Sequence, residues 1–479
     1  MLTPMESLAR RIPSVVIVAA LCLPVLVLLF PHSDPSILFG AVVGVSGLIA
    51  GALYWPAAFL VLPVFAPQLK SLPGLNSVQS HVDLTLLALF GAGLVILLHA
   101  ILGSHRIQFV PGRFTGSAKQ ITAFFFFAMV VAASYMYTPA PHYGGEKVIR
   151  LLLIGGFFLL APLYLINSEE DFRQFGFTFV VFAVAQSFAL FARVGRVSAS
   201  PEDQDVTRIG AGWLIGMAIL LLLFFRVVES SFWRKALILV ALPCLIAGLI
   251  ASAARGAIFA TLVASLFLFF KAYEGRNKGL VLIATTAVGL LCAGVAFYLL
   301  RGMGNGKYAD KLSEIVEMTE GHESSGSAGK RLAFYQAAVS EIPQRPLMGL
   351  GVGGWSVYYY GKDQRNYPHN ILLEIGTEEG LLGIFAFSIF VVAICRASRT
   401  LASFTGTHFA VLSGLLLFAL SAAMFSGDLD DDRLVWLWSG MTLAVLHFAQ
   451  AQLAELSFKQ RIAFWAHQPA PANTTGLAR

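Results

Sequence analysis

The feature that most constrains this chain is a succession of long apolar runs separated by short polar connections. A helix needs about 20 apolar residues to cross the hydrocarbon core of a bilayer. We expect an all-α, polytopic integral membrane protein with twelve to fourteen transmembrane helices, because the third run is short and the first three could form a broken or re-entrant arrangement. The fourteen runs are 13–30, 36–53, 56–66, 82–103, 118–137, 147–166, 174–193, 211–228, 236–252, 255–270, 279–300, 370–395, 407–425 and 434–450.

Composition supports this prediction. Of the 479 residues, 57% are hydrophobic and only 13% are charged, whereas soluble domains typically carry about 25% charged residues. The net charge of +6 comes from Lys and Arg residues scattered between apolar runs, without the basic stripe that nucleic acid binding requires. We therefore expect membrane lipids, and no nucleic acid, as partners. The four cysteines lie inside apolar runs without metal-ligand spacing, so we expect no disulfide and no zinc site.

Loop charges predict the orientation of the chain. With the N-terminus inside, the inner connections hold about twice as many Lys and Arg residues as the short outer ones, so both termini should be cytoplasmic. The single long connection, 302–368, then faces outward, and it contains two predicted amphipathic helices at 308–320 and 330–343. We divide the chain into an N-terminal transmembrane bundle (1–301), this loop (302–368), C-terminal transmembrane helices (369–452) and a cytoplasmic tail (453–479).

The strongest local motif is NYPHNILLEIGTEEGLLG at 366–383, where a polar loop turns into an apolar helix. Pro368 suits the first helical position, which would place His369 in the first turn. The positive end of the helix dipole attracts an anion there, and it lowers the affinity of an imidazole for a proton. A neutral histidine is what a general base must be. The alternative is a histidine that only caps the helix at the membrane surface.

Two arginines lie at the ends of predicted spans. Arg255, in SAARGAIF, occupies a tight turn between apolar runs, where a charge is costly unless a partner, water or a substrate anion meets it. It could grip a phosphate through paired hydrogen bonds, or extend its side chain to the outer surface. Arg208 follows PEDQDVT, so local pairing with Asp203 or Asp205 competes with a catalytic role.

Further polar residues follow in the outward-facing segments. Arg331 begins the second amphipathic helix, ahead of the glycine-rich RPLMGLGVGGW. Arg365 could reach the same anion as His369 or stay solvated. Asp428 begins an acidic cluster with 430, 431 and 432 that could bind a divalent cation, or form a solvated loop paired to Arg433. Within the cluster, Asp428 lies at the end of a predicted span and is best placed to reach the centre of the candidate site.

These elements in this order resemble the family of O-antigen ligases and O-antigen polymerases of the bacterial envelope. The resemblance is most specific from Arg331 to Gly383, and it includes the turn at Arg255 and the segment after Arg208. It implies a glycosyltransferase of the bacterial inner membrane with a periplasmic active site. Such an enzyme takes a glycan from undecaprenyl diphosphate; a ligase passes it to the core oligosaccharide of lipid A, and a polymerase passes it to another lipid-linked repeat.

The resemblance also implies residue roles. Arg208 and Arg255 would hold the diphosphate, and His369 would activate the acceptor hydroxyl in an inverting displacement that requires no metal or other cofactor. Asn370 belongs to the same motif, and our candidates for substrate binding are Arg331, Arg365, Asn370 and Asp428. We favour the ligase over the polymerase. A transporter of the lipid-linked glycan predicts ionisable residues in the middle of the spans, which are nearly free of charge here. A purely structural membrane protein would leave the cost of Arg255 unexplained.

Overall fold

The computed structural model describes residues 55–69, 84–101, 111–193, 201–228, 232–272, 327–425, 428–429 and 432–466. Within these ranges all regular structure is helical, which confirms the predicted all-α class. The first half contains η1 (Pro56–Leu60), α4 (Val61–Leu69), α5 (Leu84–Ile101), α6 (Pro111–Gly116), α7 (Ala118–Ser134), η2 (Tyr135–Tyr137), α8 (Pro141–Arg150), η3 (Leu151–Gly155), α9 (Gly156–Leu165), α10 (Glu169–Arg193), α11 (Pro201–Val228), α12 (Phe232–Ala251) and α13 (Arg255–Ala272). The second half contains α16 (Ser327–Glu341), η4 (Ile342–Gln344), α17 (Gly354–Tyr360), α18 (Ile371–Glu378), α19 (Gly380–Ala402), α20 (Gly406–Ala423) and α21 (Arg433–Ala466).

Seven helical segments of the described chain are long and apolar enough to cross a membrane, so the protein is a multi-pass membrane protein. They are Ala118–Tyr137, Pro141–Leu165, Glu169–Phe191, Arg208–Phe225, Gly380–Ala402, Gly406–Ala423 and Arg433–Glu455. Shorter apolar helices cover Pro56–Gln68, Thr85–Leu97 and Val240–Ala251. The predicted runs 13–30, 36–53 and 279–300 and the predicted amphipathic helix 308–320 lie outside the described residues.

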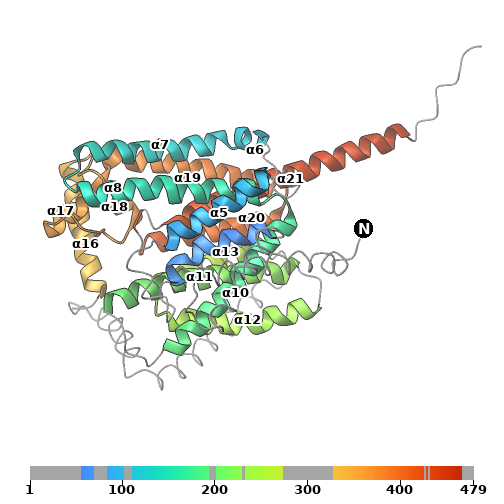
Figure 1. Ribbon diagram of the computed structural model, residues 1–479, viewed down its shortest axis with the longest axis horizontal. Coiled ribbons are helices and arrows are strands. Elements are labelled where there is room, and N and C mark those ends of the chain that lie inside the picture. The colour runs from blue at the N-terminus through green and yellow to red at the C-terminus, as the bar shows by residue number, and fades with distance from the viewer. Residues whose placement is uncertain are drawn as a thin grey trace, which may run out of the picture.

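Aromatic rings join helices that are far apart in sequence. In Figure 1, α7, α8 and α19 run lengthwise along one side of the bundle, with α10, α11 and α12 on the opposite side. The Trp436 ring of α21 lies 5.0 Å from the ring of Phe124 in α7 and 5.2 Å from that of Phe390 in α19, measured between centroids. Large rings that interlock at such distances exclude voids and fix how these three helices pack.

The predicted run 370–395 is wrong as one continuous helix. α18 ends at Glu378 and α19 begins at Gly380, whose φ is +65°. A Cβ at Gly380 would lie 2.6 Å from the carbonyl carbon of Leu347, so only glycine fits both the left-handed conformation and the close approach. Hydrophobic periodicity does not register a single left-handed residue, and this break leaves α18 as a separate short helix.

The predicted amphipathic helix 330–343 is confirmed as α16, with a different buried face. Phe334 and Ala338 are buried against Trp355 of α17, in a small core separate from the main one. Leu332 and Val339, two apolar residues seven positions apart and so on one helical face, are exposed. α16 therefore packs through its aromatic side against α17 and α18.

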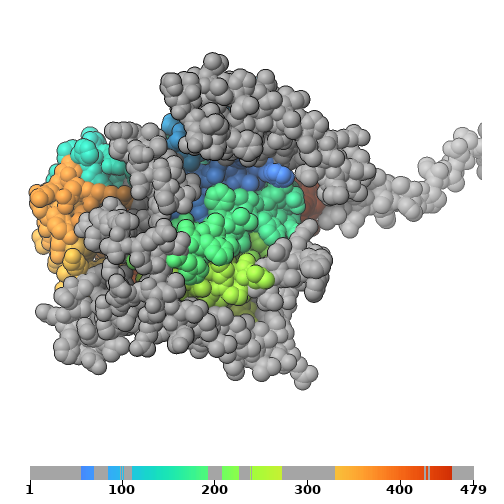
Figure 2. Space-filling model, turned by 60° about the horizontal axis from the view of Figure 1, so that its bottom comes forward, coloured from blue at the N-terminus to red at the C-terminus, as the bar shows by residue number. Residues whose placement is uncertain are grey.

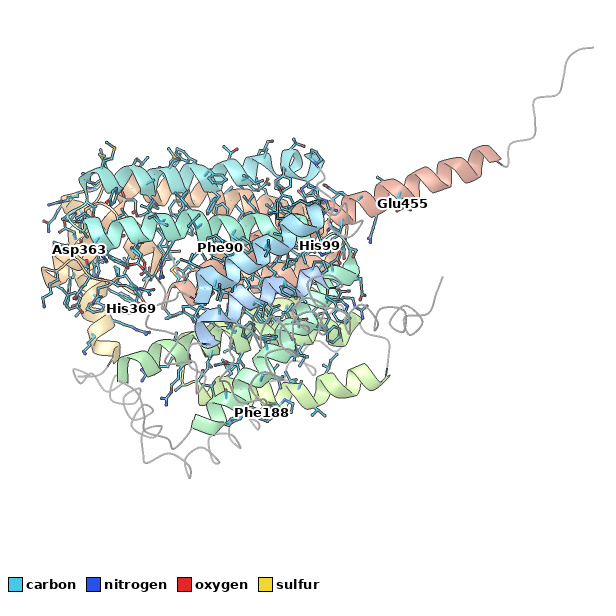
Figure 3. All side chains as sticks on the ribbon, viewed as in Figure 1. Phe90, His99, Phe188, Asp363, His369 and Glu455 are labelled. Atoms are coloured by element: carbon cyan, nitrogen blue, oxygen red, sulfur yellow. The ribbon has the colours of Figure 1, made fainter. Side chains whose placement is uncertain are left out.

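One end of the bundle gathers most of the irregular structure. It carries α16, α17 and α18, which Figure 1 shows at the left, where η2 leads into α8. The space-filling view in Figure 2 shows residues of this region, coloured orange, reaching the surface at that same end. We call it the α16–α18 end. Figure 3 places Asp363 and His369 there, and His99 and Glu455 toward the opposite end.

Candidate active site

His369 lies in the loop before α18, and its predicted position in the first helical turn is wrong. Asn370 is the N-cap residue, and its side-chain oxygen accepts hydrogen bonds from the backbone N–H groups of Leu372 and Leu373, both at 3.1 Å. An asparagine side chain satisfies two free N–H groups, which a proline at the first position does not. The helix therefore begins after Asn370, and His369 adopts a φ of +60°. Such backbone is uncommon outside glycine and marks a constrained position.

The ring of His369 is half-buried between two aromatic rings. It stacks on Phe334 with 5.9 Å between centroids and 14° between planes, and Tyr367 meets it edge-on at 4.4 Å. Burial, helped by the positive charge of Arg331 and opposed by Asp428, lowers the pKa of His369 to about 4. The imidazole is thus neutral at physiological pH, and its Nδ1 is buried without a hydrogen-bond partner among the described residues.

α16 supplies the neighbours of His369. Arg331, Phe334 and Tyr335 share one face because they are three and four residues apart. The hydroxyl of Tyr335 donates to the backbone oxygen of His369 at 3.3 Å and to that of Met424 at 3.4 Å. Tyr335 therefore joins three segments: α16, the His369 loop and the end of α20.

The end of α20 links His369 to the turn that contains Arg255. Asn370 Nδ2 donates to the oxygen of Met424 at 3.1 Å, and the next residue, Phe425, packs edge-on against Phe259 of α13 with 5.3 Å between centroids. Gly256 lies so close to Phe425 that an added Cβ would be 2.7 Å from the Phe425 Cβ. Arg255, the first residue of α13, therefore lies on the same side of the fold as His369.

Arg208 in α11 lies four residues before Gly212, and Gly212 packs against the loop that leads into Arg255. A Cβ at Gly212 in α11 would lie 2.8 Å from the Cβ of Ala254. The turn itself is held by Ser252, whose hydroxyl donates to the oxygen of Leu249 at 2.6 Å and accepts from the N–H of Ala254 at 3.2 Å. Arg208 and Arg255 thus come from neighbouring helices at the α16–α18 end, while the side chains of Asp203 and Asp205 lie outside the described residues.

The structure reveals a buried ion cluster that sequence reasoning missed. Lys147 of α8 is fully buried, and its Nζ lies 2.5 Å from Glu374 Oε1, 2.6 Å from Glu378 Oε2 and 3.6 Å from Asp428 Oδ1. The backbone N–H of Leu429 donates to Glu374 Oε1 at 3.2 Å. Glu374 and Glu378 are four residues apart in an otherwise apolar helix, and that spacing was the available sequence signal.

Asp428 connects this cluster to the His369 loop. Its carboxylate accepts hydrogen bonds from the hydroxyl of Tyr143 and from Arg365 Nε, the latter at 3.3 Å. Asp428 is completely buried, so the solvated alternative for this residue is wrong. Arg365 is not simply solvated, because its guanidinium pairs with Asp428, although part of its side chain remains exposed.

The charges in the cluster do not balance if every group is ionised. Lys147 and Arg365 face three carboxylates, those of Glu374, Glu378 and Asp428. Burial raises the pKa of Glu374 and of Glu378, and Lys147 opposes that rise in both. A proton retained on one carboxyl would restore the balance. Because the ammonium of Lys147 occupies the centre, the arrangement is an ion pair network and not a metal site; the described residues contain no group of three or more His, Cys, Asp or Glu arranged for a metal ion.

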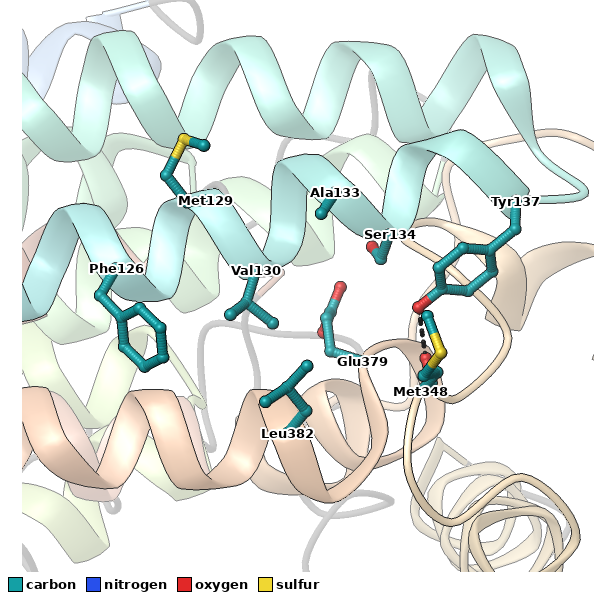
Figure 4. A pocket seen from close by; sticks show the side chains of 9 residues that line it. All are labelled: Phe126, Met129, Val130, Ala133, Ser134, Tyr137, Met348, Glu379 and Leu382. Atoms are coloured by element: carbon teal, nitrogen blue, oxygen red, sulfur yellow. Dashed lines mark hydrogen bonds between the residues drawn. The ribbon is translucent and has the colours of Figure 1, made fainter.

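Glu379 lies beside an apolar cavity between α7 and α19. The cavity has a volume of about 190 Å³, and Figure 4 shows the carboxyl of Glu379 between Val130 and Ser134. Tyr137, which also lines it, donates through its hydroxyl to the backbone oxygen of Met348 at 2.6 Å. Burial, reinforced by Glu378, raises the pKa of Glu379. The protein therefore holds a further buried carboxyl at the point where α18 meets α19.

We predict that Lys147→Met lowers the free energy of unfolding by about 3 to 5 kcal/mol, because it leaves buried carboxylates without their cation. Arg150→Met on the same helix is the control. Arg150 pairs with Glu146 at 3.0 Å, but both side chains are partly exposed, so we expect a loss of about 1 kcal/mol or less. Thermal unfolding in lipid nanodiscs measures both.

A second change sharpens this test. Adding Glu378→Gln to Lys147→Met removes one uncompensated carboxylate, so the double variant should recover part of the lost stability. Equal losses for Lys147→Met and Arg150→Met, or no recovery in the double variant, would contradict the role assigned to the cluster.

In comparisons with known proteins, part of the chain matches a protein family. Residues 239–388 match the family model described as O-antigen ligase, a segment that contains Arg255, Arg331, His369 and α18 and covers about a third of the chain. No curated protein matches the chain. The match confirms the resemblance inferred from the motifs and supports a function of the O-antigen ligase or polymerase type. Over residues 239–388 the chain is therefore similar to the O-antigen ligase family.

Proposed function

We propose that the protein is an O-antigen ligase that transfers a glycan from undecaprenyl diphosphate to the core oligosaccharide of lipid A. The observation that carries the proposal is a neutral histidine near Arg331, packed between aromatic rings at one end of a membrane bundle. Both substrates are lipids with polar head groups at the membrane surface. A site at the ends of the spans can reach those head groups while their tails stay in the bilayer.

The arginines would bind the donor. Arg208 and Arg255 lie on neighbouring helices at the α16–α18 end, and Arg331 is close enough to His369 to lower its pKa. Guanidinium groups pair with phosphate oxygens through two parallel hydrogen bonds. Held in place by the protein, they would neutralise the charge that develops on the diphosphate as it leaves.

His369 would act as the general base. As the acceptor hydroxyl oxygen attacks the anomeric carbon, its proton passes to the imidazole, and the bond from that carbon to the diphosphate breaks with its electron pair on the leaving phosphate. One displacement inverts the anomeric configuration. The scheme needs no metal or other cofactor, because diphosphate is already a good leaving group.

The remaining candidates would position these groups. Asn370 caps α18 and bonds to the end of α20, and Asp428 holds Arg365. In this proposal the α16–α18 end faces the periplasm, the protein lies in the bacterial inner membrane, and both termini are cytoplasmic.

We predict that purified protein, given an undecaprenyl diphosphate oligosaccharide and lipid A core, attaches the oligosaccharide to the lipid A core. His369→Ala should reduce transfer by about 100-fold or more, since general base catalysis typically contributes that much. His142→Ala, an exposed histidine at the same end, should transfer normally. Gel electrophoresis and mass spectrometry locate the glycan. Lengthening of the lipid-linked chain would instead identify a polymerase, and full activity of His369→Ala would remove His369 from the chemistry.

We also predict an unusually acidic pH limit for the reaction. A base loses activity as pH falls through its pKa, so kcat/KM should stay constant down to about pH 5 and fall by half only near pH 4. Arg331→Gln removes a charge that lowers the pKa of His369, so it should move this limit to higher pH. Initial rates from pH 4 to 8 test both statements. Half-maximal activity of the unmodified protein at pH 6.5, or no shift in Arg331→Gln, would contradict them.

A further inference from the structure

A row of aromatic rings runs from His369 to the surface. Phe334 stacks on His369, and the ring of Tyr359 meets Phe334 edge-on with 5.0 Å between centroids. Tyr359 in turn stacks on Trp355 at 5.3 Å and contacts Tyr360 at 4.9 Å. We call His369, Phe334, Tyr359, Trp355 and Tyr360 the aromatic row. It joins the proposed base to α17 through continuous ring contacts.

The inner half of the row is buried and the outer half is exposed. Trp355 is completely buried and Phe334 nearly so, whereas Tyr359 is 37% exposed and Tyr360 is 42% exposed. Tyr358, beside them on α17, is 41% exposed. α17 thus presents three consecutive tyrosines to the surface on a buried tryptophan anchor. Exposed apolar patches of this kind mark binding surfaces.

The loop that follows the three tyrosines is polar and is fixed to the start of α8. Its residues 361–365, GKDQR, are exposed. The carboxylate of Asp363 accepts hydrogen bonds from the backbone N–H groups of His142 and Tyr143, at 2.8 and 3.0 Å, and so fixes the loop to the start of α8. α17 therefore has a fixed position relative to the ion cluster and His369.

Rigid aromatic faces bordered by polar side chains fit saccharides. A pyranose ring has an apolar face of C–H groups that stacks on an aromatic ring, and its hydroxyls need hydrogen-bond partners at the edge. Tyr offers both an apolar ring and a polar hydroxyl at little conformational cost. A lipid acyl chain would need no such polar border.

We propose that the exposed tyrosines of α17 bind the acceptor saccharide, with its reactive hydroxyl directed along the aromatic row toward His369. This inference rests on the proposed function, because it takes the hydroxyl that His369 deprotonates to belong to the bound sugar. The donor glycan is the competing occupant. We assign the row to the acceptor because it leads to His369, whereas Arg208 and Arg255 lie on α11 and α13.

Direct binding tests this proposal without relying on turnover. The probe is the core oligosaccharide released from its lipid by mild acid, titrated against the full-length protein in nanodiscs by calorimetry. Tyr360→Leu should weaken binding by about tenfold, as expected for the loss of one aromatic stacking contact, while Tyr360→Phe should bind nearly normally. Tyr135→Leu is the matched control, because Tyr135 is also 42% exposed but lies at the end of α7, outside the row.

Turnover gives the second measurement. Tyr360→Leu should raise KM for the lipid A core acceptor by about tenfold, with kcat and the KM for the donor unchanged. Normal binding in Tyr360→Leu, or an equal effect of Tyr135→Leu, would overturn the proposal. Binding of the free donor oligosaccharide in place of the core oligosaccharide would also overturn it. A Tyr360→Leu variant that associated less with membranes, but bound the core oligosaccharide normally, would overturn it as well. If His369→Ala remained active while the core bound as predicted, the proposed chemistry would fail and the saccharide site would stand.

Discussion

The site depends on one buried ammonium group. Lys147 is surrounded by carboxylates from α18 and from the connection between α20 and α21. Removing such charges from water is expensive, and only close pairing repays the cost. The paired state can form only when α8, α18 and this connection are all in place. The ion cluster therefore couples the positions of these three segments, which must form together at the α16–α18 end.

The position of His369 follows from that geometry. The ion pairs of Glu374 and Glu378 with Lys147 fix α18. The side chain of Asn370 fixes the start of the same helix, because it caps the helix and also bonds to the backbone oxygen of Met424. Asp428 extends the network to Arg365, four residues before His369. The histidine is therefore held by its flanking residues and by the rings of Phe334 and Tyr367, while its Nδ1 has no hydrogen-bond partner among the described residues. In the proposed mechanism, a base fixed in this way would cost little reorganisation during the reaction.

Much of the architecture could be predicted from the sequence, because bilayer crossing imposes long apolar runs. The helices at 118–137 and 407–425 and the amphipathic helix at 330–343 follow from pattern alone. The break at Gly380 could not, since one left-handed residue leaves the hydrophobic pattern intact.

For the site, sequence reasoning singled out His369 and the arginines, because polar residues at span ends are conspicuous. Sequence reasoning placed His369 in the helix because it took Pro368 as the first helical residue. In the structure the side chain of Asn370 caps the helix instead, so the helix begins two residues after His369. Lys147 is the first residue of the predicted apolar run 147–166, and nothing in its local pattern marks it as buried. Only tertiary packing brings it to carboxylates more than 200 positions away, and no local pattern encodes that partnership.

We propose that this end of the bundle faces the periplasm, where the two proposed substrates would be found. Single cysteines at Lys362, exposed beside α17, and at Arg399, exposed near the opposite end of α19, test it in a background without the native cysteines. A membrane-impermeant maleimide is applied to cells with a permeabilised outer membrane. The account predicts labelling at 362 in intact cells and at 399 only after the inner membrane is broken. The reverse pattern would separate His369 from its substrates and contradict the account.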